Sequence, residues 1–187
     1  MTVRALQIFW LFGTTLFLSG AVLPGPLSTG TTYTISFLDI EGNKLSTADG
    51  HVTIVVLTTT ADHEKARTVG DRVPDLCLGN PEYRMITVIH FTRRHLTIGR
   101  RVATAFIRHR VREEGKRLQA RYDAKEISRD ASRDIFVVTD FDGTVTSNLG
   151  QPAGANEFCV FVFGRTGELV AQWHDVPSAD QLASALK

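Results

Sequence analysis

Apolar residues along this chain form short continuous runs. Between these runs lie stretches in which apolar residues recur every three or four positions, as on one side of a helix. Runs with the character of β-strands occupy residues 33–40, 51–57, 84–90, 134–139, 158–163 and 168–173. The run at 51–57 is almost entirely apolar and β-branched, which is typical of a central strand covered on both faces. The turn at residues 164–167 (GRTG) separates the last two runs, and together they predict a hairpin.

Three stretches have the spacing of helices. Residues 61–77 predict a helix with Asp62 at its N-cap, which Pro74 kinks or ends. Residues 97–122 predict one long helix whose large apolar residues lie near one side, namely Ile98, Val102, Phe106, Val111, Leu118 and Tyr122. Ser178 is predicted to cap a final helix that runs through Leu186. Strands that alternate with helices, followed by a hairpin and a closing helix, predict an α/β protein with a mixed sheet.

The N-terminus has the composition of a targeting segment. Arg4 precedes an apolar run at residues 5–18, and small residues follow at 19–21. This order predicts that residues 1–23 are a secretory signal peptide cleaved after Ala21, or an uncleaved membrane anchor. A buried N-terminal helix is the remaining alternative. Residues 24–32 are predicted to be a linker and residues 33–187 a single domain.

Composition narrows the classes of function. The net charge of +1 gives no overall field that would attract nucleic acid. Basic residues cluster between 93 and 121, and we interpret them as a solvated helix face rather than a nucleic-acid or membrane-binding surface. The two cysteines, Cys77 and Cys159, exclude a disulfide-dense scaffold and a four-cysteine zinc site, but the sequence leaves open whether they pair. The six histidines are scattered, so we expect no metal and no cofactor.

Four local segments, in this order, carry a resemblance to a known family. They are residues 37–46 (FLDIEGNKLS), 52–57 (VTIVVL), 140–145 (DFDGTV) with Leu149 and Gly150, and 161–170 (FVFGRTGELV). Together they resemble the thioredoxin-like fold, especially the exported thiol-disulfide oxidoreductases and their peroxiredoxin relatives. The resemblance covers residues 33–187 and implies a central mixed sheet flanked by helices. It also implies that the redox motif of the family should follow the central strand, at residues 58–65.

The redox motif is absent from that position. Residues 58–65 read TTTADHEK, without a cysteine, and the position of the cis-proline of the family falls near Phe158. Thiol exchange needs a thiolate that is stabilised at a helix N-terminus. The resemblance therefore implies a vestigial pocket, formed by Thr60, Asp62, His63, Phe158 and Cys159. The resulting hypothesis is an extracytoplasmic binding or accessory module, with a protein or peptide partner and with membrane contact only through the N-terminal segment.

Two enzymatic alternatives stay open. The first is an atypical thiol-disulfide oxidoreductase that works through Cys159. The second rests on residues 140–144 (DFDGT), which match the motif of the haloacid dehalogenase phosphatases, with Asp140 as nucleophile and Asp142 as acid/base beside Mg²⁺. Only 47 residues follow Asp140, too few for the remaining residues of that family. A strand end followed by a turn is the favoured interpretation of this motif.

We predict that residues 1–32, fused to a reporter enzyme that is active only outside the cytoplasm, give reporter activity. The reason is the order of Arg4, the apolar run and Ala21, which secretion machinery recognises. Activity measured in whole cells, with Arg4 retained and the apolar run interrupted by two aspartates as the control, tests this. A reporter that stays soluble in the cytoplasm would contradict the targeting prediction.

Overall fold

The computed structural model describes residues 25–91, 97–152 and 157–187. The predicted signal peptide or anchor at residues 1–23 lies outside the described residues. Within the described part of the chain, no helix is both long enough and apolar enough to cross a membrane.

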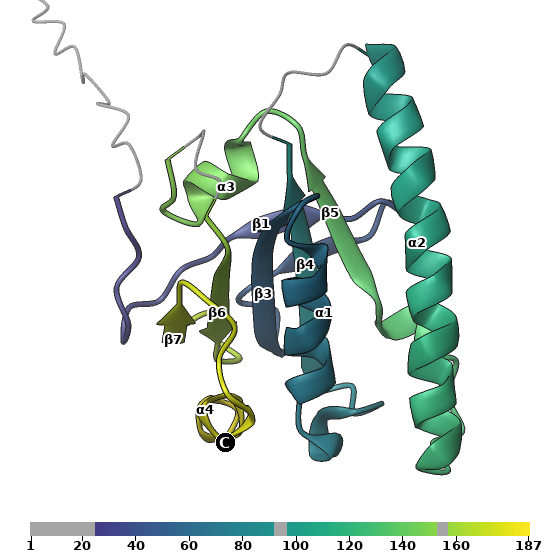
Figure 1. Cartoon of the computed structure of the whole chain (residues 1–187). Helices are drawn as coiled ribbons and strands as arrows, with labels where there is room; N and C mark the ends of the chain where they lie inside the picture. Colours follow the sequence, from purple (N-terminus) through teal and green to yellow (C-terminus); the bar gives the residue numbers. More distant parts are fainter. Residues whose placement is uncertain (1–24, 92–96, 153–156) are drawn as a thin grey trace, which may run out of the picture.

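A five-stranded sheet forms the centre of the domain, with the strand order β5-β4-β3-β6-β7 (Figure 1). Strands β3 (Val52–Thr59), β4 (Tyr83–His90) and β5 (Phe136–Asp140) are parallel. Strands β6 (Cys159–Phe163) and β7 (Leu169–Trp173) form the predicted hairpin, and β6 runs antiparallel to β3. The prediction of an α/β protein with a mixed sheet is confirmed.

Strand β3 lies at the middle of the sheet and is covered on both faces. Its residues from Ile54 to Leu57 are at most 2% exposed, and they alternate between two apolar clusters. The β-branched side chains of this run pack well on a pleated surface that is buried on both sides. The strand pairs with β4 up to Thr59↔His90 and with β6 at Leu57↔Cys159.

One face of the sheet packs against helices α1 (His63–Arg72) and α4 (Ala179–Ala185) (Figure 1). Helix α1 ends before Pro74, as predicted, and the short 3₁₀ helix η1 (Asp75–Cys77) follows it. Ser178 caps α4, also as predicted. Its hydroxyl accepts a hydrogen bond from the backbone N–H of Gln181, whose side chain accepts one from the Ser178 backbone N–H.

The other face is covered by the hairpin of β1 (Ser36–Leu38) and β2 (Lys44–Ser46) and by the short helix α3 (Thr144–Asn148) (Figure 1). The cluster on this face consists of Ile35, Phe37, Leu45, Val55, Leu57, Ile86, Val88, Val138, Leu149, Cys159, Phe161, Phe163 and Leu169. Helix α3 was not predicted from the sequence.

The segment before β2 also touches both edges of the sheet. Thr32 forms an isolated antiparallel bridge with Glu168, and the Gly30 N–H donates to the Leu169 carbonyl at 2.8 Å. At the opposite edge, the Ile40 N–H donates to the Val137 carbonyl of β5 at 2.9 Å. Residues 30–40 therefore reach from one edge strand to the other.

Helix α2 (Thr97–Ala124) stands beside the β5 edge and is followed by the 3₁₀ helix η2 (Ala131–Asp134) (Figure 1). Its buried side includes Ile107 and Tyr122. The prediction that the large apolar residues lie near one side of this helix is wrong for its first half. The three apolar residues there are exposed, namely Ile98 (79%), Val102 (66%) and Phe106 (56%). At 3.6 residues per turn, the row that contains Ile107 lies on a different side of the helix from this exposed row.

A buried arginine fixes the loop after β2 to the sheet. The Arg84 side chain of β4 is 5% exposed and donates to both carboxylate oxygens of Asp49, at 2.8 and 2.9 Å. It also donates to the Ser46 carbonyl at 2.6 Å. Burial alone would raise the pKa of Asp49, but hydrogen bonds from Arg84, His51 and Ser46 outweigh burial and lower this pKa to about 2.

We expect Asp49→Asn to lower the free energy of unfolding at pH 7, because it leaves the buried Arg84 guanidinium without a counter-charge. The expected loss is only about 1–2 kcal/mol, because part of the Asp49 side chain is solvated. The difference from the wild type should be complete above the ordinary carboxyl pKa of 3.8 and should vanish as the pH falls through about 2. Urea unfolding between pH 2 and 7 measures this. Asp71→Asn, which alters an ion pair between Asp71 of α1 and Arg121 of α2, is the matched control and should change stability by less than about 0.5 kcal/mol.

Candidate functional site

The carboxyl ends of the three parallel strands meet at one edge of the sheet. The last residues of β3, β4 and β5 are Thr59, His90 and Asp140, and α1 begins four residues after Thr59. In open α/β sheets, ligands bind outside the carboxyl ends of the strands. The carboxyl ends of these strands are therefore the expected location of a ligand-binding site, and they include part of the predicted vestigial pocket.

The start of α1 is polar and is held by short contacts. Asp62 occupies the predicted N-cap position, but its side chain caps no backbone N–H. Its carboxylate instead accepts a hydrogen bond from the Thr59 hydroxyl at 3.1 Å. His63 lies with Nδ1 3.3 Å from the Thr60 carbonyl and with Nε2 3.0 Å from the Glu64 carboxylate. The expected N-cap hydrogen bond is thus replaced by a bond to a loop hydroxyl.

The start of β6 divides the predicted pocket between the two faces of the sheet. Phe158 packs in the cluster under α1 and α4, and the Lys65 ammonium lies 5.5 Å from the centre of its ring. Cys159 packs in the opposite cluster with Leu57 and Phe161. Since consecutive strand residues point to opposite faces, Phe158 lies on the same side as the start of α1 and Cys159 does not.

Cys159 instead contacts a histidine that the sequence analysis did not single out. Its Sγ lies 3.3 Å from Nδ1 of His174, and that nitrogen lies 3.8 Å from Oε2 of Glu157. Among the described residues, these three form the one close group of three or more potential metal ligands. Val160 pairs with Trp173, and Cys159 and His174 are the next residues outward. A register shift between Val162 and Phe163 sets this alignment, so the length of the hairpin alone does not predict the contact.

Neither cysteine is exposed or paired. Cys77 and Cys159 are both buried free thiols, and they lie in the clusters on opposite faces of the sheet. Burial raises the pKa of Cys77 to about 11. Burial and the charge of Glu157 raise the pKa of Cys159 to about 11. Both thiols are therefore protonated at neutral pH and are poor nucleophiles in this state.

Asp140 has a structural role in this arrangement. It is 2% exposed and accepts hydrogen bonds from the Thr146 backbone N–H at 2.8 Å and from the Thr146 hydroxyl at 2.6 Å. Hydrogen bonds from the Thr144 side chain and backbone lower the pKa of Asp142, the reverse of what a general acid needs. The DFDGT segment thus ends β5 and bends at residues 141–143, in line with the favoured interpretation, and its last residue starts α3.

His90 is the other buried polar group at this edge. It is 4% exposed, and its Nδ1 lies 3.4 Å from Oδ2 of Asp140 without forming a hydrogen bond. Neither of its ring nitrogens has a hydrogen-bond partner among the described residues. Residues 92–96, which follow β4 closely, lie outside the described part of the chain.

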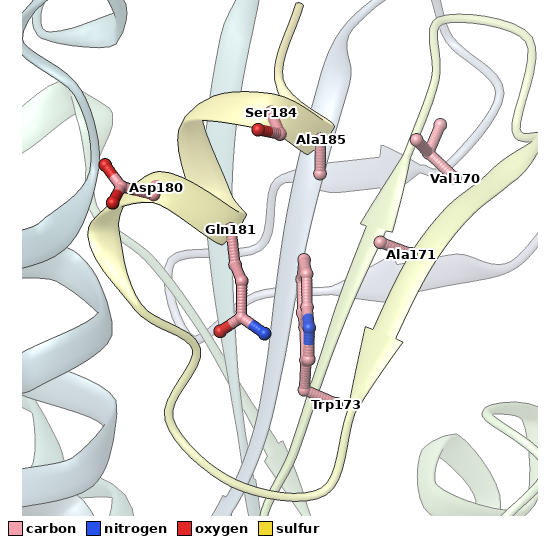
Figure 2. A pocket seen from close by; sticks show the side chains of 7 residues that line it. All are labelled: Val170, Ala171, Trp173, Asp180, Gln181, Ser184 and Ala185. Atoms are coloured by element: carbon pink, nitrogen blue, oxygen red, sulfur yellow. The ribbon is translucent and has the colours of Figure 1, made fainter.

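A shallow groove lies elsewhere on the domain, between β7 and α4. Gln181 points from α4 toward Trp173 of β7, whereas Asp180 points away from the strand (Figure 2). Apart from Asp180, the groove is lined by apolar, amide and hydroxyl side chains, namely Val170, Ala171, Trp173, Gln181, Ser184 and Ala185. Its one carboxylate, Asp180, points away from the strand, which disfavours acid–base chemistry in this groove (Figure 2).

Comparison with known proteins identifies the fold. No family model and no curated protein matches the sequence. Among solved structures, the chain is similar to the exposed lipoprotein thioredoxin of Streptococcus pneumoniae, with 11% identity, a TM-score of 0.52, and coverage of 82% of this chain and 98% of that one. It is also similar to a DsbF homologue from Corynebacterium diphtheriae, with 11% identity, a TM-score of 0.50, and coverage of 93% and 98%.

A third similar structure is that of MTB DsbF in mixed oxidised and reduced forms, with 13% identity, a TM-score of 0.51, and coverage of 81% of this chain and 92% of that one. Identities this low establish a shared fold. The chain therefore has a thioredoxin-like fold, as the sequence resemblance implied.

We predict that the purified full-length chain does not hydrolyse phosphate monoesters in the presence of Mg²⁺, because the Asp140 carboxylate is buried and hydrogen-bonded to Thr146. Asp140→Asn should instead lower the free energy of unfolding by about 1–3 kcal/mol, since it disturbs these buried hydrogen bonds. Asp142→Asn, at the more exposed carboxylate, is the matched control and should change stability less. Phosphatase turnover that Asp140→Asn abolishes would overturn the structural role.

Proposed function

We propose that this chain is a thioredoxin-like binding or accessory module that does not exchange disulfides. The observation that carries the proposal is the start of α1, where residues 60–63 (TADH) stand in place of a redox-active cysteine. Disulfide exchange in this fold depends on a thiolate at a helix N-terminus, where the partial positive charge of the helix lowers the thiol pKa. The two thiols of the chain lie elsewhere and are buried.

The proposed binding surface consists of Thr60, Asp62, His63 and Phe158. Thr60 is exposed, Asp62 and His63 are half-buried, and Phe158 forms an apolar floor beneath Lys65. Such a combination suits a short extended segment with polar side chains, and Phe158, which is 4% exposed, supports the surface from beneath. The carboxylate of Asp62 disfavours an anionic ligand at this helix start, so a neutral or basic peptide is the proposed class of partner.

We place the module outside the cytoplasm. The support is the order of charge, apolar run and small residues at the N-terminus. The similar protein from S. pneumoniae is described as an exposed lipoprotein, in agreement with such a location.

A second candidate function is thiol chemistry at Cys159. The observation in its favour is the 3.3 Å contact between Cys159 Sγ and Nδ1 of His174, because a protonated imidazole next to a cysteine stabilises the thiolate. Against it stands the burial of Cys159, which together with Glu157 raises the thiol pKa to about 11.

The test of the first proposal is insulin reduction by the full-length chain with a thiol reductant as electron source. The expected result is no acceleration over the reductant alone, because no thiol lies at the start of α1. Acceleration that is lost in both Cys159→Ala and His174→Ala, and retained in Cys77→Ala, would support the second candidate instead. Activity that needs Cys77 would contradict both candidates.

The binding part of the proposal is tested with a peptide library of varied charge and apolar content. Wild type should select neutral or basic peptides, and Asp62→Lys should weaken the best of them by about tenfold, which corresponds to about 1.4 kcal/mol. Asp180→Lys, the same charge change in the first turn of α4, is the matched control and should leave affinity unchanged. Absence of binding to the wild type, or equal affinity for Asp62→Lys, would contradict the proposed surface.

A further inference from the structure

The outer end of the β6–β7 hairpin brings together three side chains with different metal-binding atoms. Cys159 Sγ lies 3.3 Å from Nδ1 of His174, and the same nitrogen lies 3.8 Å from Oε2 of Glu157. One ligand atom from each of the three residues lies within 4.8 Å of the other two. A thiol sulfur, an imidazole nitrogen and a carboxylate oxygen thus face a common point.

The backbone explains why these side chains converge. Cys159 and His174 are the residues next to the last pair, Val160↔Trp173, and opposite residues of antiparallel chains project to the same face. Glu157 precedes Cys159 by two residues, which places it on the same face for as long as the chain stays extended. The convergence therefore follows from strand register, even though two of the three side chains are at the surface.

The distances suit a tetrahedral ion. Around Zn²⁺, a sulfur at about 2.3 Å and a nitrogen at about 2.0 Å are separated from each other by about 3.5 Å. The sulfur–nitrogen separation of 3.3 Å is close to this value. The nitrogen–oxygen separation of 3.8 Å is longer than the distance of about 3.3 Å expected for N and O ligands at about 2.0 Å. The His174 and Glu157 side chains are 63% and 66% exposed, so small rotations can close the remaining difference without disturbing the core. Cys159, by contrast, is fixed by its packing.

Charge also favours a cation at this point. A Cys159 thiolate and the Glu157 carboxylate together carry two negative charges, which one divalent ion neutralises. On binding, the sulfur–metal bond replaces the sulfur–hydrogen bond, and the proton passes to solvent. Thiolate and imidazole are ligands that Zn²⁺ and similar transition metals prefer, whereas Mg²⁺ and Ca²⁺ prefer sites made of oxygen.

The geometry points to a divalent transition-metal site formed by Glu157, Cys159 and His174, with Zn²⁺ as the ion of best fit and water in the fourth position. This site is separate from the proposed peptide surface, since Cys159 lies on the opposite face of the sheet from Phe158. It reverses the expectation from the sequence that the chain has no metal ligands.

The test is a titration of the reduced, metal-free full-length chain with Co²⁺, which reports its ligands by absorption. We expect one equivalent to bind, with a thiolate-to-cobalt charge-transfer band and the visible bands of tetrahedral Co²⁺. One equivalent of Zn²⁺ should remove both signals, and excess Mg²⁺ should remove neither. Failure of the wild type to bind one equivalent, or binding without the charge-transfer band, would overturn the site.

Variants assign the ligands. His174→Ala and Glu157→Gln change exposed side chains, so the fold should persist, and each should weaken Co²⁺ binding by about tenfold or more. Cys159→Ala should abolish the charge-transfer band. Cys77→Ala, at the other buried thiol, and His63→Ala, at another histidine beside a glutamate, are matched controls that should leave binding unchanged. Binding that is unaffected by His174→Ala, or a charge-transfer band lost in Cys77→Ala, would contradict the assignment.

Discussion

The burial of β3 between two apolar layers is the constraint on which the other elements depend. Its odd-numbered residues Val55 and Leu57 join the cluster beneath the β1–β2 hairpin, and Ile54 and Val56 join the cluster beneath α1 and α4. Each fully buried side chain of this size contributes about 1.5–3 kcal/mol. Because both layers share this strand, its direction determines where α1 begins and which residues of β6 lie beside that helix start.

The alternation of side chains along β6 separates two kinds of chemistry that are adjacent in sequence. Phe158 contributes an apolar surface on the side of α1, and Cys159 contributes a thiol on the opposite side, next to His174. A single residue step thus places the proposed peptide surface and the proposed ion site in different surroundings.

Much of the fold follows from local patterns in the sequence. The apolar run of β3, the turn between β6 and β7, the end of α1 before Pro74 and the capping box at Ser178 depend on neighbouring residues, and all were predictable. The side of α2 that faces the core was not predictable in its first half. Apolar residues form more than one row on a long helix, and only tertiary contacts decide which row is buried.

The candidate sites show the same division between local and long-range information. Asp62 was correctly placed at the start of α1, but the partner of its carboxylate, the Thr59 hydroxyl, depends on how the loop folds. His174 was missed, because its position next to Cys159 depends on a register shift between Val162 and Phe163 within the hairpin. A lone cysteine and a lone histidine 15 residues apart carry no metal-site pattern until the strands between them are paired.

The course of residues 30–40 has a consequence for the behaviour of the domain in a crowded solution. An open sheet ends in two strands whose free N–H and C=O groups can pair with another chain, a common route to aggregation. Here the bridge between Thr32 and Glu168 occupies part of the β7 edge, and the Ile40 N–H occupies the Val137 carbonyl at the β5 edge. The backbone of residues 30–40 thereby disfavours the addition of a strand from a second copy at both the β7 edge and the β5 edge.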